Sequence, residues 1–184
     1  PIGYAPGMAG MSLFAMLLLL GISVAFEQRW IRSQHLYDLV ASAVAHGAAG
    51  LCATVAVLAQ SRGTIPAVLV GVVVSLVALP RRSTWALRLG LVVAALAVFR
   101  AKLAAPYSAM FDLRQAPFTD GADEPALLAA AEAAAHSAAI AALTITVALV
   151  LVGLALVPLG AWLGDRVGEL EERAGTSLAL PISV

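Results

Sequence analysis

The sequence predicts an all-α integral membrane protein, and two observations support that prediction. Of the 184 residues, 61% are apolar and only 12% are charged, whereas soluble domains are about 45–50% apolar and about 25% charged. The apolar residues also gather into uncharged runs about as long as a helix needs to cross a hydrocarbon core roughly 30 Å thick. Each run must be helical, because a lone strand in lipid would leave its backbone groups unpaired.

Charge and cysteine content exclude several classes of protein. Eleven Lys and Arg balance eleven Asp and Glu, so the chain has neither a basic character suited to nucleic acid nor an acidic disordered tail. The single cysteine, Cys52, excludes a disulfide framework and a cysteine-based zinc site. The sequence also lacks a Gly-rich phosphate loop, an HExxH pair and a nucleophile elbow. No enzymatic activity is therefore predicted.

The uncharged runs predict a bundle of about five transmembrane helices. Four of the spans cover residues 8–26, 39–60, 65–79 and 137–163. A fifth is expected over residues 85–105, although its uncharged part between Arg88 and Arg100 is short. We expect these long basic side chains to extend toward the headgroups from the helix ends. The alternative for 85–105 is a helix lying on the membrane surface, which would leave four spans.

The last span is expected to belong to a longer helix that extends outside the bilayer. Residues 126–162 alone would form a helix of roughly 55 Å, and its Ala-rich start is only mildly apolar. Asp123 or Glu124 would cap that start. Residues 106–124 are expected to form an extramembrane loop before the helix, and residues 165–184 a cytoplasmic tail after its membrane part. The whole chain, 1–184, is then a single polytopic domain.

The distribution of Lys and Arg predicts an orientation, because these residues favour the cytoplasmic side. With five spans, one side of the membrane receives seven of them and the other receives four. The C-terminus is then cytoplasmic and the N-terminus lies outside. With four spans the count becomes eight against three, and both termini lie outside. Hydropathy favours the arrangement with five spans. The Ala/Val/Leu-rich composition is typical of bacteria with GC-rich genomes, so we expect a multi-pass protein of the bacterial inner membrane.

Aromatic residues are expected to mark the membrane interfaces. The four that fall at proposed span ends are Trp30, Tyr37, Trp85 and Tyr107. Tryptophan and tyrosine are enriched at headgroup level, where one part of the side chain is apolar and the other is polar. We therefore interpret them as an interfacial belt rather than as ligand contacts.

Few ionisable residues fall at membrane depth, and each is a candidate for function because a charge in lipid is costly. His35, Asp38, Ser42 and His46 recur at spacings that place them on one face of a helix. Small residues beside His46 leave room for a neighbouring helix or for a flat macrocycle. This stripe would carry protons or hold a metal ion. The structural alternative is that Asp38 caps the helix and His46 hydrogen-bonds to another helix.

A second pair of candidates, Glu132 and His136, lies four residues apart near the start of the last helix. They would supply two metal ligands or a proton relay, and the alternative is a solvated pair outside the bilayer. His46 and His136 are also candidate axial ligands of a haem. In the five-span arrangement their helices are antiparallel, which places the two side chains on opposite sides of the membrane. The cofactor therefore stays open between a haem, a metal ion and none.

Aromatic residues of the segment expected outside the bilayer are candidates for partner binding. They are Tyr107, Phe111 and Phe118. Apolar side chains on an exposed loop are typical of a protein contact. Small residues four apart, such as Ala43 with Gly47 and Gly90 with Ala94, also allow helices to approach closely. The expected partners are the lipid bilayer and either other membrane subunits or further copies of the chain.

Three functions remain open at this point. The first is a non-catalytic subunit of a larger membrane protein complex, whose helices pack on partner subunits. The second is a small channel or transporter for a metal ion, a proton or a small solute, which would use the His/Asp stripe on the second span. The third is a membrane redox protein that binds a haem or a pigment through His46.

Overall fold

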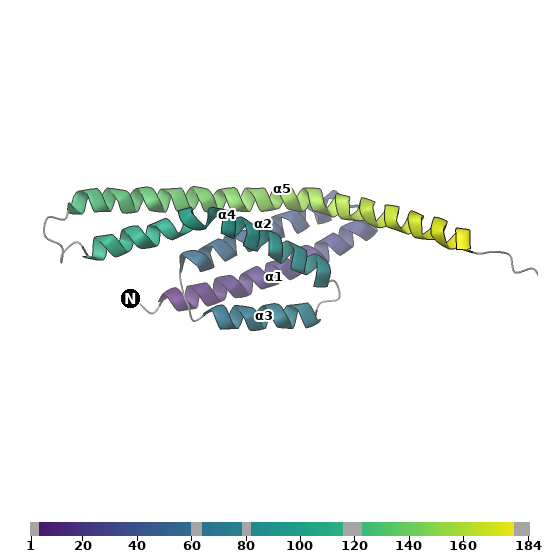
Figure 1. Ribbon diagram of the computed structural model, residues 1–184, viewed down its shortest axis with the longest axis horizontal. Helices are drawn as coiled ribbons and strands as arrows, with labels where there is room; N and C mark the ends of the chain where they lie inside the picture. Colours follow the sequence, from purple (N-terminus) through teal and green to yellow (C-terminus); the bar gives the residue numbers. More distant parts are fainter. Residues whose placement is uncertain (1–3, 60–63, 79–81, 116–122, 179–184) are drawn as a thin grey trace, which may run out of the picture.

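Five helices make up the described part of the chain (Figure 1). The structure is a computed structural model that describes residues 4–59, 64–78, 82–115 and 123–178. In chain order the helices are α1 (Tyr4–Ser33), α2 (Leu36–Leu58), α3 (Thr64–Ala78), α4 (Arg82–Gln115) and α5 (Glu124–Leu178). Within these ranges there is no strand. The all-α membrane bundle predicted from the sequence is confirmed.

Four of the helices, α1, α2, α4 and α5, are long and apolar enough to cross a membrane. One of them, α4, contains residues 85–105, for which the sequence left a surface helix as the alternative. It has 34 residues and buries Trp85, Val92 and Leu103 in the common core. A helix lying on the membrane surface would not bury side chains among the spans, so α4 is a member of the bundle.

The short helix α3 runs back along the bundle, from the end where α2 finishes to the end where α4 begins. Its 15 residues measure about 22 Å, less than the roughly 30 Å of a hydrocarbon core. The end of α2 and the start of α4 nevertheless lie at opposite ends of the bundle. Arg88, near the start of α4, bonds to Glu27, near the end of α1, whereas α2 runs antiparallel to α1 (Figure 1). The chain between α2 and α4 must therefore cross back, which supports five crossings.

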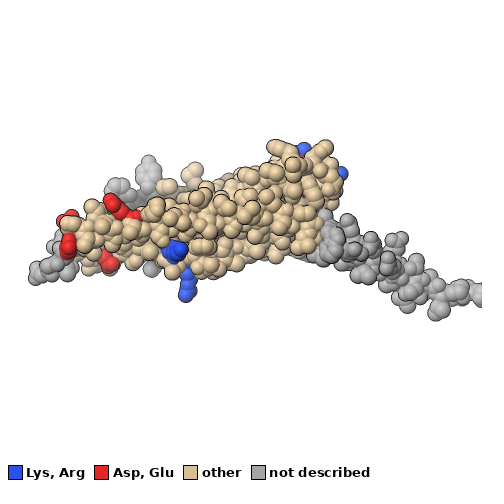
Figure 2. Space-filling view, turned by 90° about the horizontal axis from the view of Figure 1, so that it is seen from above, with Lys and Arg blue, Asp and Glu red and all other residues tan. Residues whose placement is uncertain are grey.

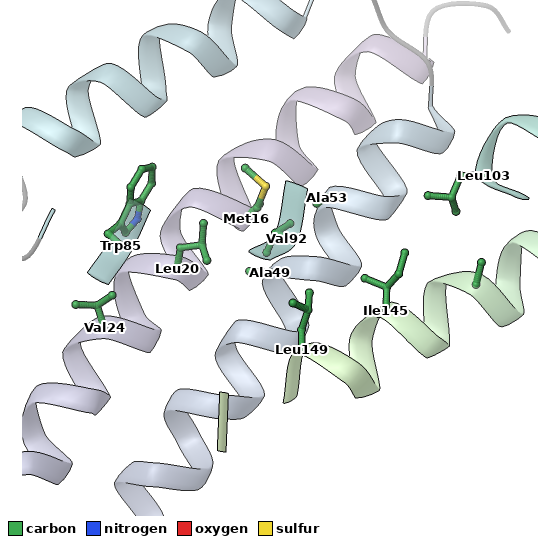
Figure 3. Close-up of a cluster of buried hydrophobic side chains, with 11 residues drawn as sticks. Met16, Leu20, Val24, Ala49, Ala53, Trp85, Val92, Leu103, Ile145 and Leu149 are labelled. Atoms are coloured by element: carbon green, nitrogen blue, oxygen red, sulfur yellow. The ribbon is translucent and has the colours of Figure 1, made fainter. Parts of the chain in front are cut away.

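The apolar core lies along a seam of α1, α2, α4 and α5 (Figure 3). Its buried side chains include Met16, Leu20, Ala49, Ala53, Val92, Ile145 and Leu149. Lipid tails are as apolar as these side chains, so helices in a membrane associate through close packing and hydrogen bonds rather than through the hydrophobic effect. Small residues on α2 provide that close packing.

α2 and α5 approach each other closely, and glycines allow the two backbones to come together. A Cβ atom at Gly47 would lie 2.9 Å from the backbone oxygen of Thr146. A Cβ atom at Gly153 would lie 3.1 Å from the Cα atom of Ala43. The small pair Ala43 and Gly47, which the sequence marked as a helix contact, thus faces α5.

Exposed cations mark two levels of the bundle. They are Arg29 and Arg32 at the end of α1, and Arg100 and Lys102 on α4. Along α4 the step from Arg88 to Arg100 is about 18 Å, and along α1 the step from Glu27 to Arg32 is about 8 Å. Because Arg88 and Glu27 are bonded to each other, the two levels lie about 26 Å apart, close to the thickness of a hydrocarbon core. Acidic side chains gather beyond one of these levels, at one tip of the molecule (Figure 2).

Beyond Lys102, α4 and α5 form a helical hairpin that extends out of the bundle (Figure 1). α4 continues through Pro106 to Gln115, so the first part of the loop predicted for residues 106–124 is helical instead. Proline removes one backbone hydrogen bond and crowds the carbonyl of the preceding turn, which costs stability, but it does not end this helix. The hairpin reaches about 20 Å beyond Lys102.

The start of α5 follows the sequence prediction. The Asp123 carboxylate accepts a hydrogen bond from the Ala126 backbone N–H at 3.3 Å, as an N-cap residue does. The helix then runs for 55 residues, about 83 Å, and therefore extends past both cationic levels. It continues to Leu178, so most of the tail predicted for residues 165–184 is helical. Figure 1 shows α5 bending toward its C-terminal end, and the helix contains Pro158.

Candidate functional site

The candidate site begins at the tight hairpin between α1 and α2. Gln34 turns the chain with a φ of 54°, and the extended residue His35 is the N-cap of α2. Two serines then fix the register of the hairpin. The Ser23 hydroxyl donates to the Ser42 backbone oxygen at 2.7 Å, and the Ser42 hydroxyl donates to the Ser23 backbone oxygen at 2.8 Å.

Arg88 of α4 inserts between these two helices and is only 2% exposed. Its Nη2 donates to the Glu27 Oε2 at 2.7 Å and to the Ser42 Oγ at 3.1 Å, and its Nη1 donates to the Ser23 Oγ. A buried charge is tolerated only when it is paired and hydrogen-bonded. The predicted extension of Arg88 toward the headgroups is therefore wrong. The Glu27 carboxylate provides a countercharge inside the bundle, and the side chain stays there.

Three residues of this cluster, Ser23, Glu27 and Arg88, were not among the candidates derived from the sequence. The sequence does contain a signal for Ser23 and Glu27, which is their spacing along α1. Glu27 directly follows an uncharged run, and Ser23 precedes it by four residues, so both lie on one face of α1. Arg88 has no comparable local signal, because its partners come from helices distant in the sequence.

His46 lies one turn deeper on α2 than Ser42, and its side chain is fully buried. Its Nε2 is 3.3 Å from the Arg88 backbone oxygen, and its Nδ1 has no hydrogen-bond partner among the described residues. A Cβ atom at Gly153 of α5 would lie 3.5 Å from that Nδ1. The imidazole is thus enclosed between α4 and α5, and a flat macrocycle would fit beside it only if α2 and α5 moved apart.

The second proposed haem ligand is far from the first. His136 precedes Gly153 by seventeen residues on α5, which corresponds to about 25 Å along the helix. His46 contacts α5 at Gly153, so the two imidazoles cannot ligate a single iron. The residues around His46 do not fit a haem held by these two ligands.

Asp38 forms the outer end of the cluster, near the α1–α2 turn. Its buried carboxylate accepts a hydrogen bond from the Ser33 hydroxyl at 2.8 Å, and its Oδ1 lies 3.5 Å from the Arg29 Nε. Asp38 sits in the first turn of α2, after the N-cap His35. The predicted capping role is therefore wrong, although a carboxylate in the first turn still interacts favourably with the helix dipole.

Asp38, Ser42 and His46 are all buried on one face of α2, as the spacing predicts. His35, the fourth member of the predicted stripe, is exposed at the start of the helix. Glu132 and His136 are exposed on α5. Within the ranges that the structure describes, no three His, Cys, Asp or Glu side chains come together as a metal site would require.

Comparison with known proteins adds no relative. No protein-family model, no curated protein and no solved structure matches the chain. The function must therefore be argued from the geometry of the chain itself.

The predicted aromatic residues have different environments. Tyr107 and Phe111 are 56% and 51% exposed on the part of α4 that belongs to the hairpin, whereas Phe118 lies outside the described residues. Trp85 is fully buried and packs in the core, so its predicted place in an interfacial belt is wrong. One face of the first turns of α4 packs against the bundle, and Trp85 lies on that face, whereas the neighbouring Ala86 and Leu87 are exposed.

The polar cluster occupies only one end of the bundle, where its buried groups form a row that we call the polar seam. From Asp38 to His46 the buried polar face of α2 extends about 12 Å. Beyond His46 the buried residues of this face are small, including Gly47, Ala49 and Gly50, and the two glycines pack against α5. Thr54 is also buried, but its hydroxyl donates to the Gly50 backbone oxygen of its own helix. The arrangement can hold three helices in register, and it places a carboxylate and an imidazole inside the membrane region. Among the described residues, the buried polar groups do not form a continuous path across the bundle.

Proposed function

We propose that the chain is a non-catalytic subunit of a membrane protein complex, and that α4 is its contact helix. The observation that carries this proposal is an uncovered stripe of small residues, hereafter the α4 stripe. Its exposed members are Ala86, Gly90, Ala94, Ala97, Ala101, Ala104 and Ser108. They recur every three or four residues, which is close to the period of a helix–helix seam.

Lipid contact explains the α4 stripe poorly. Large side chains face outward on the other helices and, beside the stripe, on α4 itself, at Leu87, Val93 and Val98. Small residues on an outer face instead allow a second backbone to approach, which is the contact that drives association in lipid. A Cβ atom at Gly90 would meet nothing within 4 Å, so this position is open to a partner helix.

The α4 stripe leads into the hairpin that extends beyond the cationic level. Phe111 follows Ser108 by three residues and therefore continues the same face, with Tyr107 beside it. Half-exposed aromatic side chains outside the bilayer favour a protein contact. One partner lying along α4 would cover both the α4 stripe and these aromatic residues.

The positive-inside rule supports a placement of this subunit. Arg29 and Arg32 lie at the end of the bundle from which α5 continues toward the C-terminus. With five spans, seven Lys and Arg fall on that side and four on the other, and six remain on that side once Arg88, which is paired with Glu27, is left out. We therefore propose that this end faces the cytoplasm of a bacterial cell, with the acidic hairpin on the opposite side of the inner membrane.

The proposal predicts that Ala94→Leu separates the chain from its partner. The chain would be extracted from its native membrane in a mild detergent, and its assembly measured by native mass spectrometry. Wild type is expected to retain a partner subunit or a second copy, and Ala94→Leu to reduce that retention at least tenfold, because the leucine fills the space that the partner backbone needs. Phe111→Asp is expected to weaken retention through the hairpin.

The matched control is Ala148→Leu, the same change at an exposed position of α5. It should leave the assembly intact. A wild-type chain that leaves the membrane as a single-chain monomer would contradict the proposal, as would unchanged retention in Ala94→Leu.

A second proposal, a small proton or ion transporter, rests on a different observation. The Glu27–Arg88 ion pair and the enclosed His46 are ionisable groups at membrane depth, and such groups commonly mark transport paths. The polar seam ends at His46 and does not cross the bundle. If the chain is a transporter, the described arrangement is therefore its closed state. Transport would require α5 to move away from Gly47 and Gly50.

The transport proposal predicts that His46→Gln abolishes flux in proteoliposomes. Glutamine can still donate to the Arg88 backbone oxygen, so the variant is expected to fold, but it cannot take up a proton at neutral pH. Proton flux driven by a membrane potential should fall at least tenfold, while His136→Gln, an exposed control on α5, should match wild type. Equal flux in wild type and His46→Gln would exclude the predicted role of His46.

A further inference from the structure

A groove of about 550 Å³ opens between α1 and α3 on the outer face of the bundle. Phe14, Leu18, Ile22 and Ala25 of α1 line it opposite Gly71 and Val74 of α3. The α1 residues lie between the two cationic levels, so the groove belongs to the hydrocarbon region. Its lining is almost entirely apolar, and its volume is within the range of known small-molecule sites.

The same face of α1 ends in two arginines. The exposed positions Leu18, Ile22, Ala25, Arg29 and Arg32 recur every three or four residues and form one stripe. Arg29 is 69% exposed and its Nε lies 3.5 Å from the Asp38 Oδ1. Its guanidinium carbon also lies 5.7 Å from the centroid of the Phe26 ring. These two contacts hold Arg29 about one turn beyond the end of the groove, at headgroup level.

The charges around this end leave a net positive balance. Asp38 partly compensates Arg29, and Glu27 is paired with Arg88 inside the bundle. Arg32 is exposed and makes no ion pair with a carboxylate in the described ranges. An anion at this level would therefore meet two guanidinium groups, which bind phosphate oxygens through several donors at once.

We infer that this groove binds one anionic phospholipid. An acyl chain lies along α1 beside Gly21 and Gly71, and the lipid phosphate binds Arg29 and Arg32. Any groove that faces the bilayer takes up hydrocarbon, but the two arginines select a lipid with a net negative headgroup, because a zwitterionic headgroup carries its own compensating cation. Basic pockets beside transmembrane helices bind anionic headgroups for this reason. The inference is independent of the contact proposed for α4.

The test is native mass spectrometry of the full chain, delipidated in detergent and then mixed with phosphatidylglycerol or phosphatidylcholine of identical acyl chains. We expect one phosphatidylglycerol per chain, retained at least tenfold more strongly than phosphatidylcholine. The double variant Arg29→Gln/Arg32→Gln should lose this preference. Arg100→Gln/Lys102→Gln, which removes two exposed cations at the opposite level, should keep it.

Two further arms separate the groove from a simple anion site. Gly21→Leu should weaken the binding of both lipids, since a Cβ atom at Gly21 meets nothing within 4 Å and the leucine would extend into the groove. Soluble glycerol phosphate should not displace the bound lipid. Equal binding of the two lipids, a preference that survives in the Arg29→Gln/Arg32→Gln variant, or displacement by glycerol phosphate would overturn the inference.

Discussion

Replacing Arg88 by methionine is expected to lower the free energy of unfolding by about 3–5 kcal/mol. Methionine has a similar length and fills the space, so the effect comes from charge rather than from a cavity. The Glu27 carboxylate would lose the guanidinium that donates to it at 2.7 Å and remain as an uncompensated charge inside the bundle. Thermal or denaturant unfolding of the purified variant in detergent measures the loss.

The control is the double variant Glu27→Leu/Arg88→Met, which removes both charges together. Replacement of a buried ion pair by apolar residues is often neutral or stabilising, so most of the lost stability should return. The serines stay satisfied in this background, because Ser23 and Ser42 donate to each other's backbone oxygens. A double variant whose loss equals the sum of the two single losses would contradict this account of the cluster.

This double variant also separates the two proposed functions. If it folds and still assembles with a partner, the ion pair is dispensable for the contact along α4. In a transporter, by contrast, removal of Glu27 and Arg88 would stop transport even though the fold persists. A buried ion pair is weak evidence for stability by itself, so its presence at membrane depth is informative only through such a comparison.

The sequence alone predicts the parts of this site that lie on one helix. The spacing of Asp38, Ser42 and His46 predicts a single face of α2, and the structure buries all three there. Helical spacing determines which residues share a face whatever surrounds the helix. The same argument did not extend to His35, because the turn at Gln34 makes His35 the N-cap and leaves it exposed.

The ion pair could not be predicted in the same way. Glu27 and Arg88 are 61 positions apart in the sequence, and each lies near the end of an apolar run, where a charge is ordinarily solvated. Only the packing of α4 against the α1–α2 hairpin brings them together. A single sequence does not contain that packing, so it predicts an Arg88 side chain that extends toward the headgroups, whereas the structure buries it.

For two of the predicted spans, hydropathy does not match the length of the helix that the segment forms. Hydropathy alone made residues 65–79 a clear span, yet α3 has only 15 residues. Residues 85–105 contain Arg88, which shortens their uncharged run, yet they form part of a 34-residue helix. The hydropathy of a segment counts every charge as exposed to lipid, whereas Arg88 is buried against a countercharge.

A second large effect is expected at the contact between α2 and α5. Gly47→Ala should lower the free energy of unfolding by about 1–3 kcal/mol, the usual cost of overpacking. The added Cβ would overlap the Val150 Cγ2 and lie 2.9 Å from the Thr146 backbone oxygen. A valine side chain is stiff and a helix backbone cannot yield locally, so α5 must move away as a whole.

Two alanine variants provide matched comparisons in the same unfolding assay. Gly50→Ala should cost less than Gly47→Ala, because its close contact is the Leu149 Cδ1, the far end of a flexible side chain, and its next neighbour is 3.5 Å away. Gly10→Ala, where nothing lies within 4 Å, should not destabilise the protein. Equal losses at Gly47 and Gly50 would show that the backbone contact does not set the helix spacing.

The displacement caused by Gly47→Ala also bears on function, because the contact that it disturbs encloses His46. Movement of α5 would carry Gly153 away from the imidazole, whose Nδ1 has no hydrogen-bond partner among the described residues. In a non-catalytic subunit the variant should lose stability and nothing else. In a transporter, flux per folded molecule should rise, since the variant favours the separation of α2 and α5 that opens the seam. Flux measured against the folded fraction therefore distinguishes a rigid helix contact from a gate.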